Sequence, residues 1–176
     1  MRQQTMLGNG VMKKNRLSRA IAAIIGVAMI GLAAPAGADE FDDAFIAYSS
    51  GDFETARIFF LTLAEGGDIR AQFLLGRIYS EGQGVAKNEA ESVKWYLLAA
   101  SSGDIVSQLA LGTMYVNGRG VKQDFVQAYS WFTIVAASGS RDMTSQALDV
   151  RDLIEQMMTS AQIEEAETIA AVWTPQ

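Results

Sequence analysis

Closely spaced carboxylates are the residues of this sequence best suited to acid–base chemistry. Two groups stand out: Glu89 with Glu91, and Glu164 with Glu165 and Glu167. Paired carboxylates act as general acid and base in glycoside hydrolysis. Here they fall in the first turns of predicted helices or on a charged helix face, where acids favour the helix dipole or stay solvated. The pattern therefore favours a structural role, and no catalytic residue is predicted.

Two residue types that dominate catalysis and metal binding are missing from all 176 positions. The chain has no His, the usual general base and the commonest metal ligand. It has no Cys, which removes thiol nucleophiles, Cys-ligated zinc, disulfides and a lipobox. The Ser-x-x-Lys motif of serine β-lactamases is also missing. We therefore expect no enzyme activity, no metal and no cofactor.

Two glycine motifs have the composition of phosphate-binding loops. They are Gly82-Gln83-Gly84 and Gly118-Arg119-Gly120. Dinucleotide-binding loops follow a strand and continue to a third glycine before a helix. These motifs follow predicted helices instead, so we interpret them as turns, with glycine supplying the positive φ that a helix C-cap needs.

Charge is distributed unevenly along the chain. The five basic residues before position 39 lie in a segment without Asp or Glu, and the remainder carries nine Lys and Arg against 20 Asp and Glu, a formal net charge of −11. An acidic body repels phosphate backbones and anionic membrane surfaces. We therefore expect no nucleic-acid partner.

The elements that position these residues belong to an internal repeat. The segment LLGRIYSEGQGV at 74–85 returns 36 residues later as ALGTMYVNGRGV at 110–121. Eight pairs share this spacing: Gly76/Gly112, Tyr79/Tyr115, Gly82/Gly118, Gly84/Gly120, Val85/Val121, Trp95/Trp131, Ala100/Ala136 and Gly103/Gly139. Such a period is typical of an α-solenoid, in which helix pairs stack on their neighbours.

Each repeat is predicted to contain two helices. The predicted ranges are 69–80, 89–101, 105–116 and 125–137. Asp68 and Asp104 are the expected N-caps of the first helices. The second helices begin with the capping-box pairs Asn88/Glu91 and Asp124/Gln127. Gly76 and Gly112 lie inside helices, and we expect them to make room for Trp95 and Trp131 of the paired helix.

Less regular units flank the two repeats. A helix over 41–50 pairs with one that begins at Phe53, and the last helices cover 144–157 and 163–172, with Thr159 and Gln162 as a further capping box. The expected organisation is a signal peptide over 1–38, an atypical helix pair over 39–67, repeats over 68–103 and 104–139, and capping helices over 140–176. The predicted fold is all-α, a solenoid of about eight helices in antiparallel pairs.

These motifs resemble the Sel-1-like repeat family, which is related to the tetratricopeptide repeats. The resemblance rests on Leu75-Gly76, Tyr79, Gly82-x-Gly84-Val85, Trp95, Ala99-Ala100 and Gly103 and on their second copies. It is specific over 68–140, and the segment 158–173 resembles the tail of bacterial members. Many members have Pro where this chain has Ala86 and Lys122. The resemblance implies a non-enzymatic scaffold that binds proteins, with roles in envelope signalling and exopolysaccharide production.

In tetratricopeptide repeats the first helix of each pair lines the binding surface. By analogy the predicted binding face consists of Arg70, Phe73, Arg77, Ser80, Val106, Leu109, Thr113 and Val116. Because Arg70 and Arg77 are cations in an acidic domain, they predict capture of an acidic segment or a C-terminal carboxylate. The alternative is that several of these side chains pack against adjacent helices.

The first 38 residues have the order of a secretory signal peptide. A basic segment with Lys13, Lys14, Arg16 and Arg19 precedes an apolar run over 20–34, and Ala36-Gly37-Ala38 precedes Asp39. This order predicts cleavage after Ala38, with Met12 as an alternative start. An apolar run of about 15 residues is shorter than the roughly 20 that span a bilayer, and an uncleaved anchor is the alternative. We expect a periplasmic or secreted protein with no stable membrane insertion after cleavage.

Taken together, the sequence predicts a scaffold or adaptor of the bacterial envelope with a protein or peptide partner. The alternative is a periplasmic binder of peptidoglycan or polysaccharide. Aromatic side chains exposed on the binding face would favour that alternative, because sugar rings stack on them.

Overall fold

The computed structural model of the protein describes residues 38–138 and 141–175. The chain divides into two units, 1–35 and 36–176, and all described residues belong to the second. The predicted signal peptide lies outside the described residues except for Ala38, where the first described helix begins. Within the described ranges, every helix is too short or too polar to cross a membrane.

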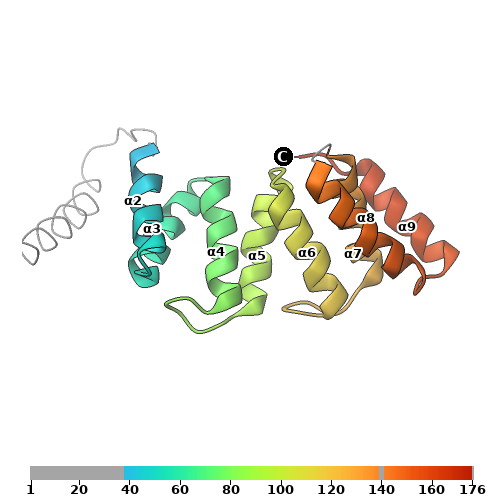
Figure 1. Ribbon diagram of the computed structural model, residues 1–176, viewed down its shortest axis with the longest axis horizontal. Helices are drawn as coiled ribbons and strands as arrows, with labels where there is room; N and C mark the ends of the chain where they lie inside the picture. The colour runs from blue at the N-terminus through green and yellow to red at the C-terminus, as the bar shows by residue number, and fades with distance from the viewer. Residues whose placement is uncertain (1–37, 139–140, 176) are drawn as a thin grey trace, which may run out of the picture. The chain divides into compact units, whose positions relative to one another are not determined.

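The second unit is a row of helices that follow one another in sequence order (Figure 1). They are α2 (Ala38–Ser49), α3 (Phe53–Glu65), α4 (Ile69–Glu81), α5 (Glu89–Ser101), α6 (Ile105–Asn117), α7 (Phe125–Ala137), α8 (Arg141–Glu155) and α9 (Ser160–Val172). The described residues contain these eight helices and no strand, so the predicted all-α solenoid is confirmed.

The helices pack as hairpins through most of the row. Helix α2 packs on α3, α4 on α5 and α6 on α7, and the hairpins stack through contacts of α3 with α4 and of α5 with α6. The last two helices differ, because α8 and α9 both make their main contacts with α7. The end of the row is therefore closed by two helices that cover α7.

Side-chain caps start the helices where the sequence predicts them. The predicted N-cap residues that accept backbone hydrogen bonds are Asp68, Asn88, Asp104, Asp124 and Thr159. Asp52 does the same at the start of α3. Among the described helices only α9 has both halves of a capping box, between Thr159 and Gln162. The predicted box at Asn88 is half formed, because the Glu91 carboxylate pairs with Lys94 at 2.7 Å instead of reaching back.

Glycines inside α4 and α6 make room for an aromatic ring of the paired helix. A Cβ atom on Gly76 would lie 2.6 Å from Cδ1 of Tyr96, and one on Gly112 would lie 2.9 Å from Cζ of Phe132. The rings predicted for this place were those of Trp95 and Trp131. That prediction is wrong by one residue, although close helix approach is the reason for the glycines, as expected.

The loop after α4 packs against the start of α3, and the loop after α6 packs against the start of α5. Gly84 has φ of +64°, and a Cβ there would lie 2.8 Å from the backbone nitrogen of Glu54, at the start of α3. Gly120 has φ of +70°, and its Cβ would overlap the carbonyl of Glu89, at the start of α5. These loops are turns, as predicted, and they also join each helix pair to the one before it.

Candidate functional site

A pocket of about 310 Å³ lies where the α4–α5 hairpin meets α6. Its lining residues are Ser80, Tyr96, Val106, Leu109, Ala110, Thr113, Met114 and Arg119. We call this pocket the α4–α6 groove. Four residues of the predicted binding face line it: Ser80, Val106, Leu109 and Thr113.

The apolar wall of the groove comes from one side of α6. Val106, Leu109 and Thr113 are three or four residues apart, so helical geometry places them on the same stripe. Val106 is 38% exposed, whereas Met114 behind it is buried. The Thr113 hydroxyl donates to the carbonyl of Leu109 at 2.9 Å, which leaves its oxygen able to accept a further hydrogen bond.

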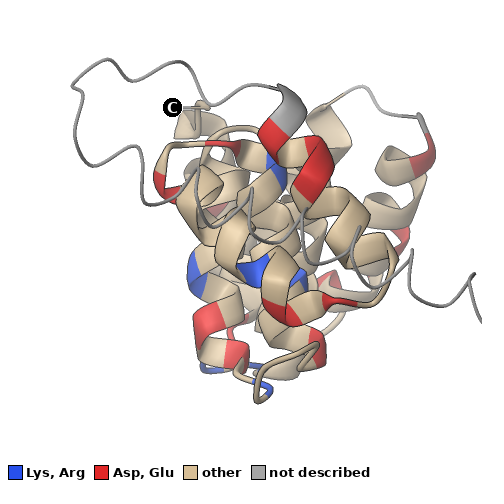
Figure 2. Cartoon of the chain, turned by 90° about the vertical axis from the view of Figure 1, so that its left-hand side faces the viewer, with Lys and Arg blue, Asp and Glu red and all other residues tan. Residues whose placement is uncertain are grey.

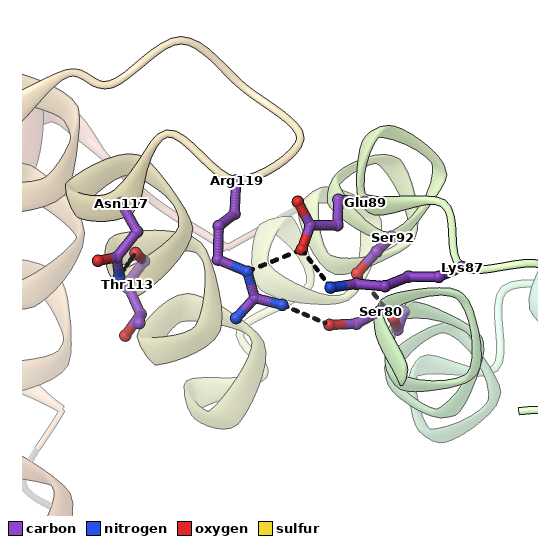
Figure 3. A network of polar contacts seen from close by, with 8 residues as sticks. Ser80, Lys87, Glu89, Ser92, Thr113, Asn117 and Arg119 are labelled. Atoms are coloured by element: carbon purple, nitrogen blue, oxygen red, sulfur yellow. Dashed lines mark hydrogen bonds and ion pairs between the residues drawn. The ribbon is translucent and has the colours of Figure 1, made fainter. Parts of the chain in front are cut away.

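Arg119 forms the cationic edge of the groove (Figure 3). It belongs to the turn after α6, and its Nε donates to a carboxylate oxygen of Glu89 at 2.9 Å, while Nη2 lies 3.4 Å from the Ser80 hydroxyl. Lys87 contacts the same Glu89 oxygen at 2.8 Å. The hydrogen bonds from Lys87 and then Arg119 hold the pKa of Glu89 below its ordinary value. Two cations thus share one ionised carboxylate.

Tyr96 of α5 lies at the base of the groove. It is 7% exposed, and burial raises the pKa of its phenol to about 12. The hydroxyl therefore remains protonated at any ordinary pH and can donate a hydrogen bond. No hydrogen bond joins it to a described residue. It is not one of the buried polar atoms without a partner, so it is open to solvent in the groove.

The two arginines predicted to supply the positive charge do not line the groove. Arg70 pairs with Asp68 at 2.7 Å, and its guanidinium lies 3.8 Å from the centre of the Phe41 ring on α2. Arg77 pairs with Glu81 at 2.8 Å along the same helix. Both side chains are exposed, but each forms an ion pair with a nearby residue, the N-cap of α4 for Arg70 and a residue of α4 for Arg77. The cation that lines the groove is Arg119.

Two further residues of the predicted face pack largely against neighbouring helices. The Phe73 ring lies 6.1 Å from that of Tyr96 and joins the apolar core on both sides of α4. Val116 packs against the core of the C-terminal helices. For these residues the structure supports the alternative reading of the sequence, in which they contribute to packing.

Sequence reasoning missed Tyr96 and Arg119 as groove residues, although the repeat contained a signal for both. The residues at the position of Tyr96 in the flanking units are Phe60 and Phe132, which lack a hydroxyl. The residue that corresponds to Arg119 in the preceding repeat is Gln83. Two departures from the repeat, one that adds a hydroxyl and one that adds a positive charge, therefore mark this groove.

The carboxylates considered for acid–base chemistry do not form a shared site. Glu89 and Glu91 each pair with a basic side chain, and Glu164, Glu165 and Glu167 are exposed on α9. No cluster of three or more potential metal ligands occurs in the described ranges. Figure 2 shows acidic residues spread over the helices with few basic residues among them, in agreement with the net charge.

A second pocket of about 420 Å³ lies beside the C-terminal tail. Trp173 and Pro175 line it together with residues of α6, α7 and α9. The Trp173 ring packs edge to face on Trp131 with 6.4 Å between ring centroids. Pro175 lies beside Gly103, where a Cβ atom would be 3.6 Å from Cβ of Pro175. The tail after α9 thus folds back over the second repeat and closes its core.

Comparison with known proteins identifies relatives of the same architecture. The sequence model of the Sel1 repeat matches residues 69–104 and 105–140. A Sel1 repeat protein from Oxalobacter formigenes is 36% identical, with a TM-score of 0.56, over 62% of this chain and 86% of that one. A protective antigen of uropathogenic Escherichia coli with an SLR fold is 28% identical, with a TM-score of 0.69, over 76% of this chain. The match covers 29% of that antigen, so this chain spans less than a third of its length. No curated protein gave a match.

Proposed function

Because the chain belongs to the Sel1 repeat family, whose members generally mediate protein–protein interactions without catalysis, we propose that it is an adaptor of the bacterial envelope. In this proposal the α4–α6 groove binds a segment of a partner protein. The observation that carries it is the groove itself, in which an apolar wall on α6 faces polar groups from two other elements. Peptide-binding grooves combine apolar contact area with a few polar groups that set orientation.

The composition of the groove favours a peptide over a polysaccharide. Sugar rings stack on exposed aromatic faces, but Tyr96, the aromatic side chain that lines this groove, is 7% exposed. The remaining lining residues are aliphatic, small or polar. Such a surface suits an apolar side chain beside a hydrogen-bonding backbone, and we therefore place protein binding ahead of glycan binding.

The proposed location of the protein in the cell depends on its first 38 residues. The basic, apolar and Ala-x-Ala segments over 1–38 support export to the periplasm or beyond, followed by removal of the leader. Regulation of envelope signalling or of exopolysaccharide production is the role that we propose there, on the basis of the family resemblance.

The proposal is tested by crosslinking the tagged chain in cells and identifying the envelope proteins recovered with it. The groove is blocked with Thr113→Arg, which fills the pocket from an exposed position of α6. Thr168→Arg on α9 is a matched control, because Thr168 is also an exposed helical threonine whose hydroxyl donates four residues back, at 2.8 Å against 2.9 Å for Thr113.

We expect one recurrent envelope protein that is lost with Thr113→Arg and retained with Thr168→Arg. Recovery of that protein with both variants would show that it binds at another surface and not at the groove. Recovery of glycan fragments alone, or of nothing above an untagged control, would refute the adaptor function.

A further inference from the structure

The chemistry of the groove is more specific than a general peptide surface, and Tyr96 is the first reason. Its ring occupies the place of Phe60 and Phe132 in the flanking units and packs against Gly76 in the same way as Phe132 packs against Gly112. The hydroxyl is therefore not needed for packing. Tyr96 lines the groove on a side chain that is more than nine-tenths buried. Its hydroxyl has no hydrogen-bond partner among the described residues and is not one of the buried polar atoms, so it is open to the groove. A hydroxyl that is open to the groove and has no partner in the protein can donate to an acceptor supplied from outside.

Arg119 is the second reason. Its Nε is committed to Glu89, but Nη2 is at 3.4 Å from Ser80, near the limit of a hydrogen bond, and Nη1 has no partner among the described residues. The side chain is 41% exposed. With Glu89 shared between Lys87 and Arg119, the cluster retains one net positive charge in an otherwise acidic domain. A guanidinium and a neutral phenol at one edge of a pocket favour a carboxylate.

The volume of the groove limits which part of a partner protein could supply that carboxylate. At about 310 Å³ it is at the low end of the roughly 300–1,000 Å³ of ligand pockets, so it has room for little more than one residue. That residue must place a carboxylate at the polar edge and an apolar group on Val106, Leu109 and Met114. An internal Asp or Glu has no apolar group beyond its own short chain. A C-terminal residue carries its α-carboxylate and its side chain on the same Cα.

We propose that the α4–α6 groove binds the C-terminal residue of a partner protein, with the α-carboxylate on Arg119 and Tyr96 and an apolar last side chain on the α6 wall. This inference rests on the proposed function and adds which end of the partner is recognised, and by which residues. It replaces Arg70 and Arg77 with Arg119 as the anion-binding arginine.

The test measures fluorescence polarisation of short labelled peptide pools with the protein expressed from its full sequence. One pool has randomised residues followed by Leu with a free carboxylate. A second is identical but ends in an amide, and a third has an internal Glu and an amide end. The variants are Tyr96→Phe and Arg119→Gln, each of which copies the residue at the equivalent position of a flanking unit, so the fold accommodates them. Arg70→Gln is the control for an exposed cation outside the groove.

We expect the free-acid pool to bind at least tenfold more tightly than either amidated pool. Arg119→Gln should weaken that binding by about tenfold or more, Tyr96→Phe by about threefold to tenfold, and Arg70→Gln by less than about twofold. Equal binding of acid and amide, no binding of the acid pool up to about 1 mM, or full binding by Arg119→Gln would each overturn the inference.

Failure of this inference is distinguishable from failure of the proposed function. If crosslinking recovers a partner that Thr113→Arg abolishes and Arg119→Gln leaves intact, the adaptor function stands and C-terminal recognition falls. If crosslinking recovers no partner, the adaptor function falls, and the peptide pools still decide whether the pocket recognises a carboxylate.

Discussion

The glycines in the loops allow the cost of backbone strain to be measured separately from the cost of a steric clash, by comparing alanine substitutions at two of them. Gly51, between α2 and α3, and Gly120, after α6, both have positive φ, +83° and +70°. Alanine at either position carries the cost of a left-handed backbone, about 1–2 kcal/mol. At Gly51 a Cβ would meet nothing within 4 Å, whereas at Gly120 it would overlap the Glu89 carbonyl. Backbone cannot move aside as a side chain can, so overpacking adds about 1–3 kcal/mol.

We therefore expect Gly51→Ala to lower the free energy of unfolding by about 1–2 kcal/mol and Gly120→Ala by about 2–5 kcal/mol. The assay is urea unfolding followed by circular dichroism and by tryptophan fluorescence, whose coincidence tests two-state behaviour. With a slope of about 2 kcal/mol per molar urea, a difference of 2 kcal/mol separates the midpoints by about 1 M. Gly84→Ala repeats the test in the loop after α4, since its Cβ would lie 2.8 Å from the backbone nitrogen of Glu54. Equal losses for Gly51→Ala and Gly120→Ala would refute the reasoning that the loop is held against α5.

Two further predictions concern the ends of the repeat region. Burial tends to raise the pKa of Asp68, but hydrogen bonds from Arg70 and from the Ala71 N–H outweigh it and hold the pKa below 3.8. A lowered pKa stabilises the fold above the unfolded value and loses that effect as the pH falls through the folded value. Asp68→Asn should therefore flatten the stability profile below about pH 4 in urea titrations, and an unchanged profile would argue against this pairing. Trp173→Ala removes the edge-to-face contact with Trp131 and should lower unfolding free energy by about 2 kcal/mol; an unchanged urea midpoint would show that the tail contributes nothing.

The helices themselves were predictable because their signals are local and occur twice. The observed bounds of α5 and α7 coincide with the predicted ranges, since Asn88 and Asp124 accept from backbone N–H groups at the start and Ser-Gly follows the end. A capping side chain acts within three residues of its own position, so the sequence contains all of the information needed.

The contacts between helices were harder to predict. The ring beside Gly76 belongs to Tyr96 and not to the adjacent Trp95, and one residue corresponds to about 100° around a helix. Two neighbouring aromatic residues give almost the same periodic pattern, and the rotation of the helix is set only when it packs. Arg119 was classified as part of a turn for a similar reason, because the direction of a loop side chain depends on the elements around it.

The glycine loops also bear on how this architecture can be extended. Each loop glycine contacts backbone 31 residues earlier, Gly84 at Phe53 and Gly120 at Glu89, so the contact is inherited whenever a complete 36-residue unit is copied. The next position in the series is Gln156, and no residue other than glycine has positive φ in the described ranges. Gln156 has a side chain where the two loops have a glycine with positive φ, and the helix that follows it, α9, packs on α7. A complete unit inserted in the middle of the array would therefore have the same loop contact with the unit before it.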